Sequence, residues 1–141
     1  MPKAPLPDDI RQFLRERHPA VVSTVRPDGS PHAATTWYMW DGEHVLLNMD
    51  RSRKRLGFME RDPRLALTVM DADNWGRSVT LLGRITEFRA DPDLADIDRL
   101  ALRYQGYTFE ARVRDSVTAV MRVDAWHGWD VDHIWGSPGV T

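Results

Sequence analysis

The stretch VVSTVRPDGSPHAATTWYMWDGEHVLLNM, residues 21–49, indicates the fold more clearly than any other part of the chain. It contains three runs rich in β-branched and apolar residues, separated by RPDGS (26–30) and DGE (41–43). Both separators contain the Asp-Gly pair of tight turns, and two such turns between three strands give an antiparallel meander. We therefore predict strands over 20–25, 31–40 and 44–49.

Three further strands are predicted after the meander. Their sequences are rich in β-branched and aliphatic residues, which favours extended structure. They are RLALTVMD (64–71), RSVTLLGRITEF (77–88) and SVTAVMRVDAWHGWD (116–130). Six short antiparallel strands with inserted helices favour a closed or split β-barrel, because closure removes the exposed edges of an open sheet. A β-sandwich is the alternative.

Three helices are predicted around these strands. The first, in DDIRQFLRERHP (8–19), has apolar residues at helical spacing and ends at His18-Pro19. The second follows residue 50, and the third covers 91–106 with an apolar stripe at helical spacing. The residues expected to cap or end the last two are Ser52 and Asp62-Pro63 for the second, and Asp91, Pro92 and Gly106 for the third.

The composition excludes several classes of protein. The formal net charge is only −2, so no nucleic-acid or acidic-membrane partner is expected. The chain has no cysteine, which excludes disulfides, thiolate nucleophiles, iron–sulfur clusters and the usual structural zinc sites. A length of 141 residues corresponds to a single domain, 1–141, and neither a signal peptide nor a membrane-length apolar run is recognisable. We expect a cytoplasmic protein.

Common catalytic and metal-binding motifs are also missing. The five histidines include no pair at i, i+4 spacing, so no metal ligands are predicted. The sequence contains no G-x-S-x-G elbow, P-loop or Rossmann glycine fingerprint. No catalytic residue is therefore assigned from the sequence.

The sequence DRSRKRLGF (50–58) places four basic side chains within positions 51–55, at the start of the second predicted helix. The positive end of the helix dipole lies there too, so each cation costs roughly 0.3–1 kcal/mol unless an anion is close. Ser52 and the free N–H groups of the first turn offer an anion site, and arginine and lysine both bind phosphate. We predict a phosphate site here, with a solvated helix surface as the alternative.

The strand HAATTWYMW (32–40) has small residues before large ones on both faces. Small side chains let a flat ligand approach the backbone, and the following aromatic residues would flank it. The alternative is a tapering barrel interior filled by small and large residues in turn. The six tryptophans suggest aromatic surface at an interface or ligand, with a tryptophan-rich core as the alternative; Trp75, in the polar context DADNWGR, is expected outside the core.

The order of these segments resembles the pyridoxamine 5′-phosphate oxidase-like split-barrel superfamily. The matching features are T-x-R-x-D-G-x-P at 24–31, W-D-G at 40–42 and D-P-R at 62–64. Within the superfamily, the chain is similar to the flavin/deazaflavin oxidoreductases that use coenzyme F(420). The resemblance covers residues 8–126 and leaves 127–141 as a loose C-terminal tail. It implies a mainly β fold with helices (α+β), namely a six-stranded antiparallel split β-barrel of the FMN-binding type.

The resemblance also implies a homodimer with two cofactor sites at the subunit interface, each built from both chains. The family's phosphate-binding serine and lysine correspond to Ser52 and Lys54, with Arg51, Arg53 and Arg55 as further cations. The residues implied along the isoalloxazine-type ring are Ala34, Thr35, Thr36 and Trp37, with Asn48 and Met49 on the neighbouring strand. The loop implied to reach a cofactor site, within one chain or across the dimer, contains Trp75, Gly76 and Arg77.

Two features depart from the family pattern. Many relatives read S-x-K-x-R-N, whereas here Leu56 and Gly57 follow the basic cluster and the distance to D-P-R is one residue longer. Counting back from Asp62 makes Arg55, instead of Lys54, the equivalent cation. Pyridoxamine phosphate oxidases proper carry a C-terminal arginine–histidine–arginine type motif, whereas this chain ends in WHGWDVDHIWGSPGVT, so that specific activity is not expected.

The implied function is a coenzyme F(420)-dependent reductase that transfers a hydride between the bound deazaflavin and a small conjugated organic substrate. The protein would supply orientation and electrostatics, and the cofactor the chemistry. The alternatives are an FMN-dependent oxidoreductase of the same fold and a flavin- or deazaflavin-binding protein without turnover. The sequence does not indicate the substrate.

Overall fold

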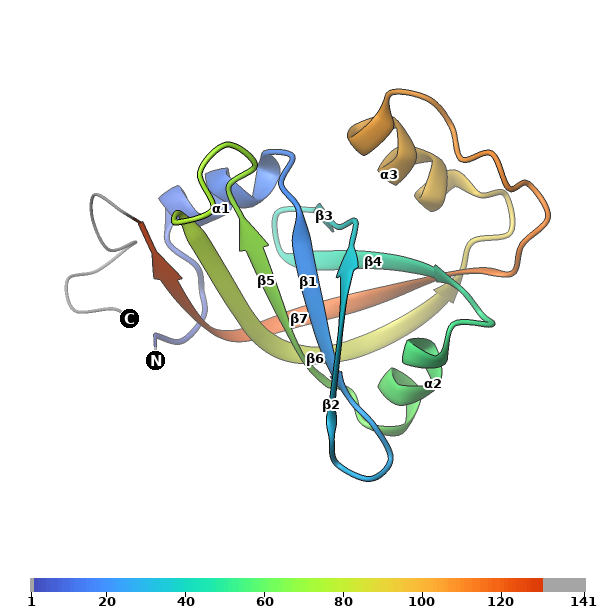
Figure 1. Cartoon of the computed structure of the whole chain (residues 1–141), viewed down its shortest axis with the longest axis horizontal. Helices are drawn as coiled ribbons and strands as arrows, with labels where there is room; N and C mark the ends of the chain where they lie inside the picture. Colours follow the sequence, from blue (N-terminus) through green and yellow to red (C-terminus); the bar gives the residue numbers. More distant parts are fainter. Residues whose placement is uncertain (1, 131–141) are drawn as a thin grey trace.

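The structure is a computed structural model in which residues 2–130 are described. This part of the chain contains seven strands and three helices (Figure 1). The strands are β1 (Ala20–Val25), β2 (Pro31–Thr36), β3 (Met39–Trp40), β4 (His44–Asp50), β5 (Arg64–Met70), β6 (Ser78–Ala90) and β7 (Ser116–Trp129). The helices are α1 (Asp8–Arg15), α2 (Lys54–Arg61) and α3 (Ala95–Gln105).

All seven strands pair in one antiparallel sheet, in the order β2-β1-β5-β6-β7-β4-β3. Its two edge strands, β2 and β3, are separated in the sequence only by Trp37 and Tyr38. The two edges must therefore lie close together, and the sheet curls into a split barrel. The predicted mainly β fold with helices is confirmed.

The predicted count of six strands is wrong, because the expected strand 31–40 breaks into β2 and β3. The break falls at Tyr38, whose side chain is fully buried in the core. Its hydroxyl donates to the carbonyl oxygen of Leu14, at the end of α1, over 3.0 Å. This anchor turns the chain away from β1 and toward β4.

The long strands β6 and β7 pair along almost their whole length and give the sheet its curvature (Figure 1). Their register shifts between Leu82 and Gly83 and again between Ile85 and Glu87. A Cβ atom at Gly83 would lie 1.8 Å from the carbonyl oxygen of Arg122. Glycine is therefore required for the close backbone approach at the first bulge.

The main core fills the barrel, and α1 covers one end of it. The apolar residues of α1, Ile10, Phe13 and Leu14, are all buried, as their helical spacing predicts. A second apolar cluster, made of Leu94, Ile97 and Leu100, lies under α3. Figure 1 shows α2 and α3 near the end of the sheet opposite α1.

The predicted start of the second helix is wrong. Helix α2 begins at Lys54 with Arg53 as its N-cap residue, and no side chain caps it. The hydroxyl and N–H of Ser52 both donate to the carboxylate of Asp50 instead. This carboxylate, at the end of β4, holds residues 50–53 in a turn that precedes the helix.

The third helix also begins later than predicted, at Ala95. Its N-cap residue is Leu94, which has a left-handed backbone conformation with φ of 62°. Asp91 still caps the helix, because its carboxylate accepts the N–H groups of Asp96 at 2.9 Å and Ile97 at 3.1 Å. A hydrogen-bonded turn over 91–94 places Asp91 beside the first helical turn. The predicted stop is confirmed, since Gly106 is the left-handed C-cap.

The last predicted strand, 116–130, corresponds closely to β7, which continues to Trp129. Residues 127–129 of the predicted C-terminal tail therefore belong to this strand. Residue 130 follows the strand, and residues 131–141 lie outside the described residues.

Candidate functional site

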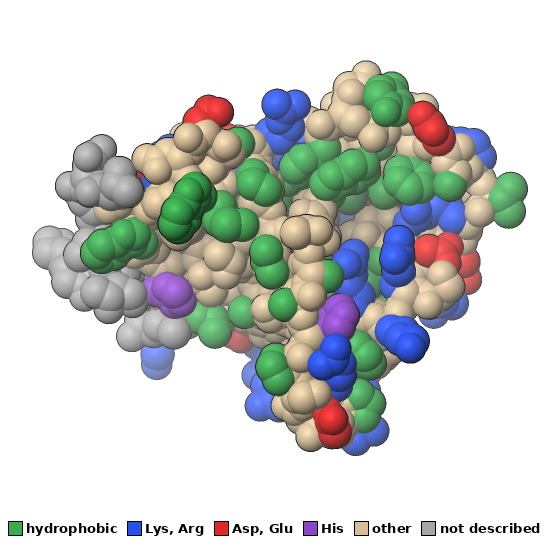
Figure 2. Space-filling view, viewed as in Figure 1, with side chains coloured by type: hydrophobic (Ala, Val, Ile, Leu, Met, Phe, Trp, Pro, Cys, Tyr) green, Lys and Arg blue, Asp and Glu red, His purple; other side chains and the backbone are tan. Residues whose placement is uncertain are grey.

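A pocket of about 620 Å³ opens between the edge strand β2, strand β4, the start of α2 and helix α3. Strand β2 and the residue after it contribute Ala34, Thr35, Thr36 and Trp37. Strand β4 contributes Asn48, Met49 and Asp50. Figure 2 shows a hollow on this face with Lys and Arg side chains gathered at it, between α3 and α2. The pocket is therefore lined by a strand edge, a helix and basic groups.

The structure brings together most of the site residues that the sequence predicts. Those lining the pocket are Ala34, Thr35, Thr36, Trp37, Asn48, Met49, Arg53 and Arg55. Those outside its lining are Arg51, Ser52, Lys54, Trp75 and Arg77. Of the two alternative cations, Arg55 lines the pocket whereas Lys54 is exposed on α2 and does not.

Specific contacts hold most of the remaining residues away from the pocket. Arg51 forms an ion pair with Asp115 at 3.1 Å. Arg77 pairs with Asp71 at 3.1 Å and with Asp130 at 3.4 Å. Trp75, which is 81% exposed, lies in the turn between β5 and β6. None of these three residues belongs to the lining of the pocket in the single chain.

One end of the pocket is strongly basic, because Arg53, Arg55 and Arg114 line it together. The Nε atoms of Arg55 and Arg114 are buried and have no hydrogen-bond partner in the described part of the chain. Burial lowers the pKa of the Arg55 guanidinium, and the positive charge of Arg53 lowers it further. A buried donor without an acceptor costs about 1–3 kcal/mol. An anion at this end would offset the positive charge of the three guanidinium groups and accept hydrogen bonds from them.

The acidic residue at this end, Asp50, is already engaged. Its carboxylate accepts the hydroxyl and N–H of Ser52 and the N–H of Asp115. These hydrogen bonds, led by that of the Ser52 hydroxyl, lower the pKa of Asp50 to about 2. Asp50 therefore ties β4 to the segment before β7 and leaves the guanidinium groups available to a ligand.

The backbone of β2 forms one wall of the pocket. Because β2 is an edge strand, its peptide groups on the side away from β1 pair with no strand of residues 2–130. The side chains there are small, at Ala34, Thr35 and Thr36. A planar ring that carries both donors and acceptors on its edge could pair with these peptide groups. The predicted ring-binding stretch thus lies in the pocket.

An aromatic cluster forms the wall on the side of α3. Trp37 stacks on Tyr104 with ring centroids 5.5 Å apart and an interplanar angle of 4°. Phe109 meets Trp37 edge-on at 6.3 Å. The hydroxyl of Tyr104 donates to the carbonyl oxygen of His18 over 2.7 Å, and burial raises the pKa of this phenol. The hydrogen bond therefore holds Tyr104 in place, and the stacking contact holds Trp37 against it.

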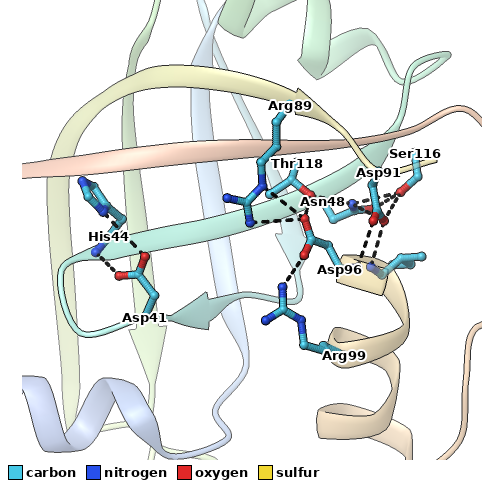
Figure 3. A network of polar contacts seen from close by, with 10 residues as sticks. Asp41, His44, Asn48, Arg89, Asp91, Asp96, Arg99, Ser116 and Thr118 are labelled. Carbon is cyan, nitrogen blue, oxygen red and sulfur yellow. Dashed lines mark hydrogen bonds and ion pairs between the residues drawn. The ribbon is translucent and has the colours of Figure 1, made fainter. Parts of the chain in front are cut away.

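A buried polar network attaches α3 and the start of β7 to β4 (Figure 3). Asn48 donates to Ser116 Oγ at 3.0 Å and to Thr118 Oγ1 at 3.1 Å. Ser116 in turn donates to Asp91, the residue that caps α3, at 2.8 Å. Asn48, predicted as a cofactor contact, thus also has a structural role.

Sequence reasoning missed several residues of the pocket. They include Arg17, His18, Tyr104, Phe109 and Arg114. Tyr104 belongs to the apolar stripe of α3, and nothing in that pattern separates a wall of a pocket from a core contact. Arg114, in RVRDS, lies two residues before the last strand and away from any basic cluster at a helix start. Only the pairing of β4 with β7 places it beside α2.

The fold and the pocket agree with a comparison against known protein families. The family model described as "Pyridoxamine 5'-phosphate oxidase" matches residues 6–131. The chain belongs to this family. Proteins of this family bind flavin or deazaflavin cofactors, and many are oxidoreductases. No curated protein is significantly similar to the chain in sequence.

Several solved structures have a fold similar to that of this chain. An F(420) reductase is 30% identical, with a TM-score of 0.79, and the match covers 86% of this chain and 98% of that one. A conserved hypothetical protein from Mycobacterium tuberculosis is 22% identical, with a TM-score of 0.71 over 91% of this chain and 86% of that one. General stress protein 26 from Bacillus anthracis is 18% identical, with a TM-score of 0.67 over 87% and 92% of the two chains. The last two show the shared fold alone.

Two searches of the described residues found no further site. Over residues 2–130, no helix combines the length and the apolar character needed to cross a membrane. Within the same range, no group of three or more His, Cys, Asp or Glu side chains is placed to hold a metal ion.

Proposed function

We propose that the protein is an oxidoreductase that binds coenzyme F(420) in this pocket and reduces a small conjugated organic substrate. The observation that supports this most is the group of three guanidinium side chains, those of Arg53, Arg55 and Arg114, that line the pocket together. They fit a phosphate group, because phosphate oxygens accept hydrogen bonds from guanidinium groups in a charge-assisted and often bidentate way. The similarity to an F(420) reductase favours the deazaflavin.

Different groups of the protein would bind different parts of the cofactor along the pocket. Arg55, Arg53 and Arg114 would hold the phosphate, and the edge of β2 would hold the ring. The small side chains at Ala34 and Thr36 leave room for the ring to lie against the strand. When bound, the deazaflavin would supply the two-electron hydride chemistry. The aromatic wall of Trp37 and Tyr104 would exclude water from the opposite side.

FMN is the second candidate cofactor. The pair of guanidinium groups at Arg55 and Arg114 also suits the phosphate of a flavin mononucleotide, and the family binds both cofactor types. We further propose that the functional unit is a homodimer with cofactor sites at the subunit interface. In that unit Trp75, exposed in the isolated chain, would be covered.

The test is a calorimetric titration of the full chain with coenzyme F(420) and, in a separate experiment, with FMN. We expect micromolar or tighter binding of the deazaflavin. Arg55→Gln should weaken it by about tenfold or more, since a hydrogen bond to a charged group contributes about 1.5–3 kcal/mol and about 1.4 kcal/mol corresponds to tenfold. Lys54→Gln removes the same charge from the neighbouring, exposed position and should change the affinity by about twofold or less, as expected for a screened surface charge.

Each alternative has its own outcome. A larger effect of Lys54→Gln would assign the phosphate to the lysine and overturn the site. Tighter binding of FMN than of coenzyme F(420) would make the protein a flavin enzyme. Binding of neither would overturn the function. A bound cofactor that reduces no quinone or conjugated carbonyl acceptor would identify a binding protein without turnover.

A further inference from the structure

We propose that Arg114, brought to the pocket by the segment before β7, is a second phosphate-binding residue that Asn48 holds in its binding orientation. This inference rests on the proposed function for its ligand, and it concerns a residue outside the basic cluster of α2. The expected ligand is a phosphate ester. Arg114 would recognise its phosphoryl oxygens, which accept hydrogen bonds.

The geometry around Arg114 leaves one part of its guanidinium without a partner. Nη2 donates to Asn48 Oδ1 at 3.0 Å, and the guanidinium carbon lies 4.7 Å from the centre of the Phe109 ring. The Nε atom is buried and unpaired within the described chain. Two sides of the group are thus fixed by protein contacts, Nε lacks an acceptor, and the side chain lines the pocket together with Arg55.

Neither nearby carboxylate supplies that acceptor. Burial lowers the pKa of Arg114, and the negative charges of Asp50 and Asp91 offset only part of this effect. Asp50 accepts from Ser52 and Asp115, and Asp91 accepts from Ser116 and the first N–H groups of α3. Both carboxylates are satisfied by these partners. The arginine is therefore not held as one half of a buried ion pair.

Asn48 can present only its oxygen to Arg114. Its amide nitrogen lies 3.4 Å from Asp91 Oδ2, which accepts hydrogen bonds and cannot donate when ionised. A flipped amide would place its oxygen against that carboxylate and its NH₂ group against the guanidinium, which has only donors. The network shown in Figure 3 therefore fixes the acceptor that orients Arg114.

The segment that carries Arg114 is itself tied down on both sides. Asp115 donates its N–H to Asp50 at 2.9 Å and pairs with Arg51 at 3.1 Å. Phe109 donates its N–H to Asp98 of α3 at 3.1 Å. A cation held in this way loses little side-chain freedom on binding, so its contribution to affinity is retained.

The first test is the binding of inorganic phosphate to the full chain at constant ionic strength, measured by calorimetry. Arg114→Gln should weaken binding about tenfold, which corresponds to about 1.4 kcal/mol. The matched control is Arg122→Gln, which removes a charge from an exposed arginine of β7 that pairs with Asp124. The control should stay within about twofold of the wild type. Equal affinities for Arg114→Gln and the wild type would overturn the proposal.

The role of Asn48 is tested by a double-mutant cycle. Asn48→Ala should weaken phosphate binding severalfold in the wild-type background and have no further effect in the Arg114→Gln background. A merely structural role would weaken binding equally in both backgrounds, which would overturn the positioning role. Thermal unfolding of each variant, measured in parallel, separates loss of stability from loss of affinity.

A third measurement needs no variant that has to fold. The Nε–H resonance of Arg114 in the wild-type protein should shift on titration with phosphate, and an unchanged resonance would overturn the proposal.

A fourth measurement compares the affinities for FMN and for riboflavin, which lacks the phosphate. The ratio of these two affinities should be smaller in Arg114→Gln than in the wild type. Because inorganic phosphate contains no ring, its titration remains informative even where no cofactor binds.

Discussion

Gly83 is the residue at which β6 and β7 approach each other most closely. We predict that Gly83→Ala lowers the free energy of unfolding by about 2 kcal/mol or more, because the new methyl group would overlap the carbonyl oxygen of Arg122. Backbone atoms cannot move aside as a flexible side chain can. Denaturant unfolding monitored by circular dichroism measures the change.

Gly57 provides the matched control for that substitution. It lies in α2, and a Cβ atom there would have no atom within 4 Å. Gly57→Ala should leave stability unchanged or raise it by up to about 1 kcal/mol, because alanine favours the helix. Similar losses at both positions would show that the bulge tolerates a side chain and that its close approach is not a constraint.

Individual residues also show where prediction from the sequence reached its limit. The basic cluster at 51–55 indicated an anion site, and the structure places Arg53 and Arg55 in a pocket. The choice between Lys54 and Arg55 depended on whether the family's motif is aligned from Ser52 or back from Asp62, and the sequence alone does not decide it. In the structure Arg55 lines the pocket and Lys54 does not. Arg114 left no local signal, because a partner strand brings it to the site.

At the scale of elements, α3 is attached to the barrel by a small apolar cluster and by buried carboxylates. Asp96 accepts the hydroxyl of Thr118 and forms ion pairs with Arg89, at 3.3 Å, and Arg99. Burial raises the pKa of Asp96, but the hydrogen bonds from Thr118 and Arg99 and the charge of Arg89 outweigh it, so the pKa lies below its ordinary value of 3.8. The ionised form is therefore the one that the fold stabilises.

This lowered pKa predicts how stability changes with acidity. Because the folded protein binds the proton of Asp96 less well than the unfolded chain, stability is fully present above about pH 5 and falls as the pH drops through the folded pKa. Thermal unfolding between about pH 6 and pH 3 measures this. Asp96→Asn, which cannot ionise, should cost about 1–3 kcal/mol at neutral pH and show a shallower decline in acid.

The corresponding control separates Asp96 from the other acids of the protein. Asp93→Asn removes a carboxylate that is exposed in the turn before α3. It should keep the pH dependence of the wild type. An unchanged acid profile in Asp96→Asn would show that the attachment of α3 does not depend on this ionised group.

The elements themselves were largely predictable, and their exact starts were not. Periodicity and turn residues located three helices and all the strand segments, because those patterns are local. The starts of α2 and α3 depend on the carboxylates of Asp50 and Asp91, each of which accepts N–H groups several residues downstream. The break at Tyr38 depends on a contact with α1 from distant sequence.

For the molecule as a whole, the closure of the sheet determines where a ligand can bind. The two edge strands are consecutive in the sequence, so the backbone of β2 is left facing the pocket instead of another strand. Helix α2, helix α3 and the segment before β7 complete the pocket from three separate parts of the chain. That the complete chain, 1–141, forms one such domain stays a prediction, because 131–141 lie outside the described residues.

The proposed homodimer is a prediction at this same scale. Trp75 and Trp129 are 81% and 51% exposed, and large aromatic surfaces of this kind are enriched at interfaces. Light scattering should give about twice the chain mass of 16.2 kDa. Trp75→Ser should shift the protein toward the monomer and weaken cofactor binding together, because the site would be built from both chains. Val113→Ser, at a 99% exposed position, is the control and should change neither. A wild-type monomer that binds the cofactor with full affinity would show that a single chain completes the site.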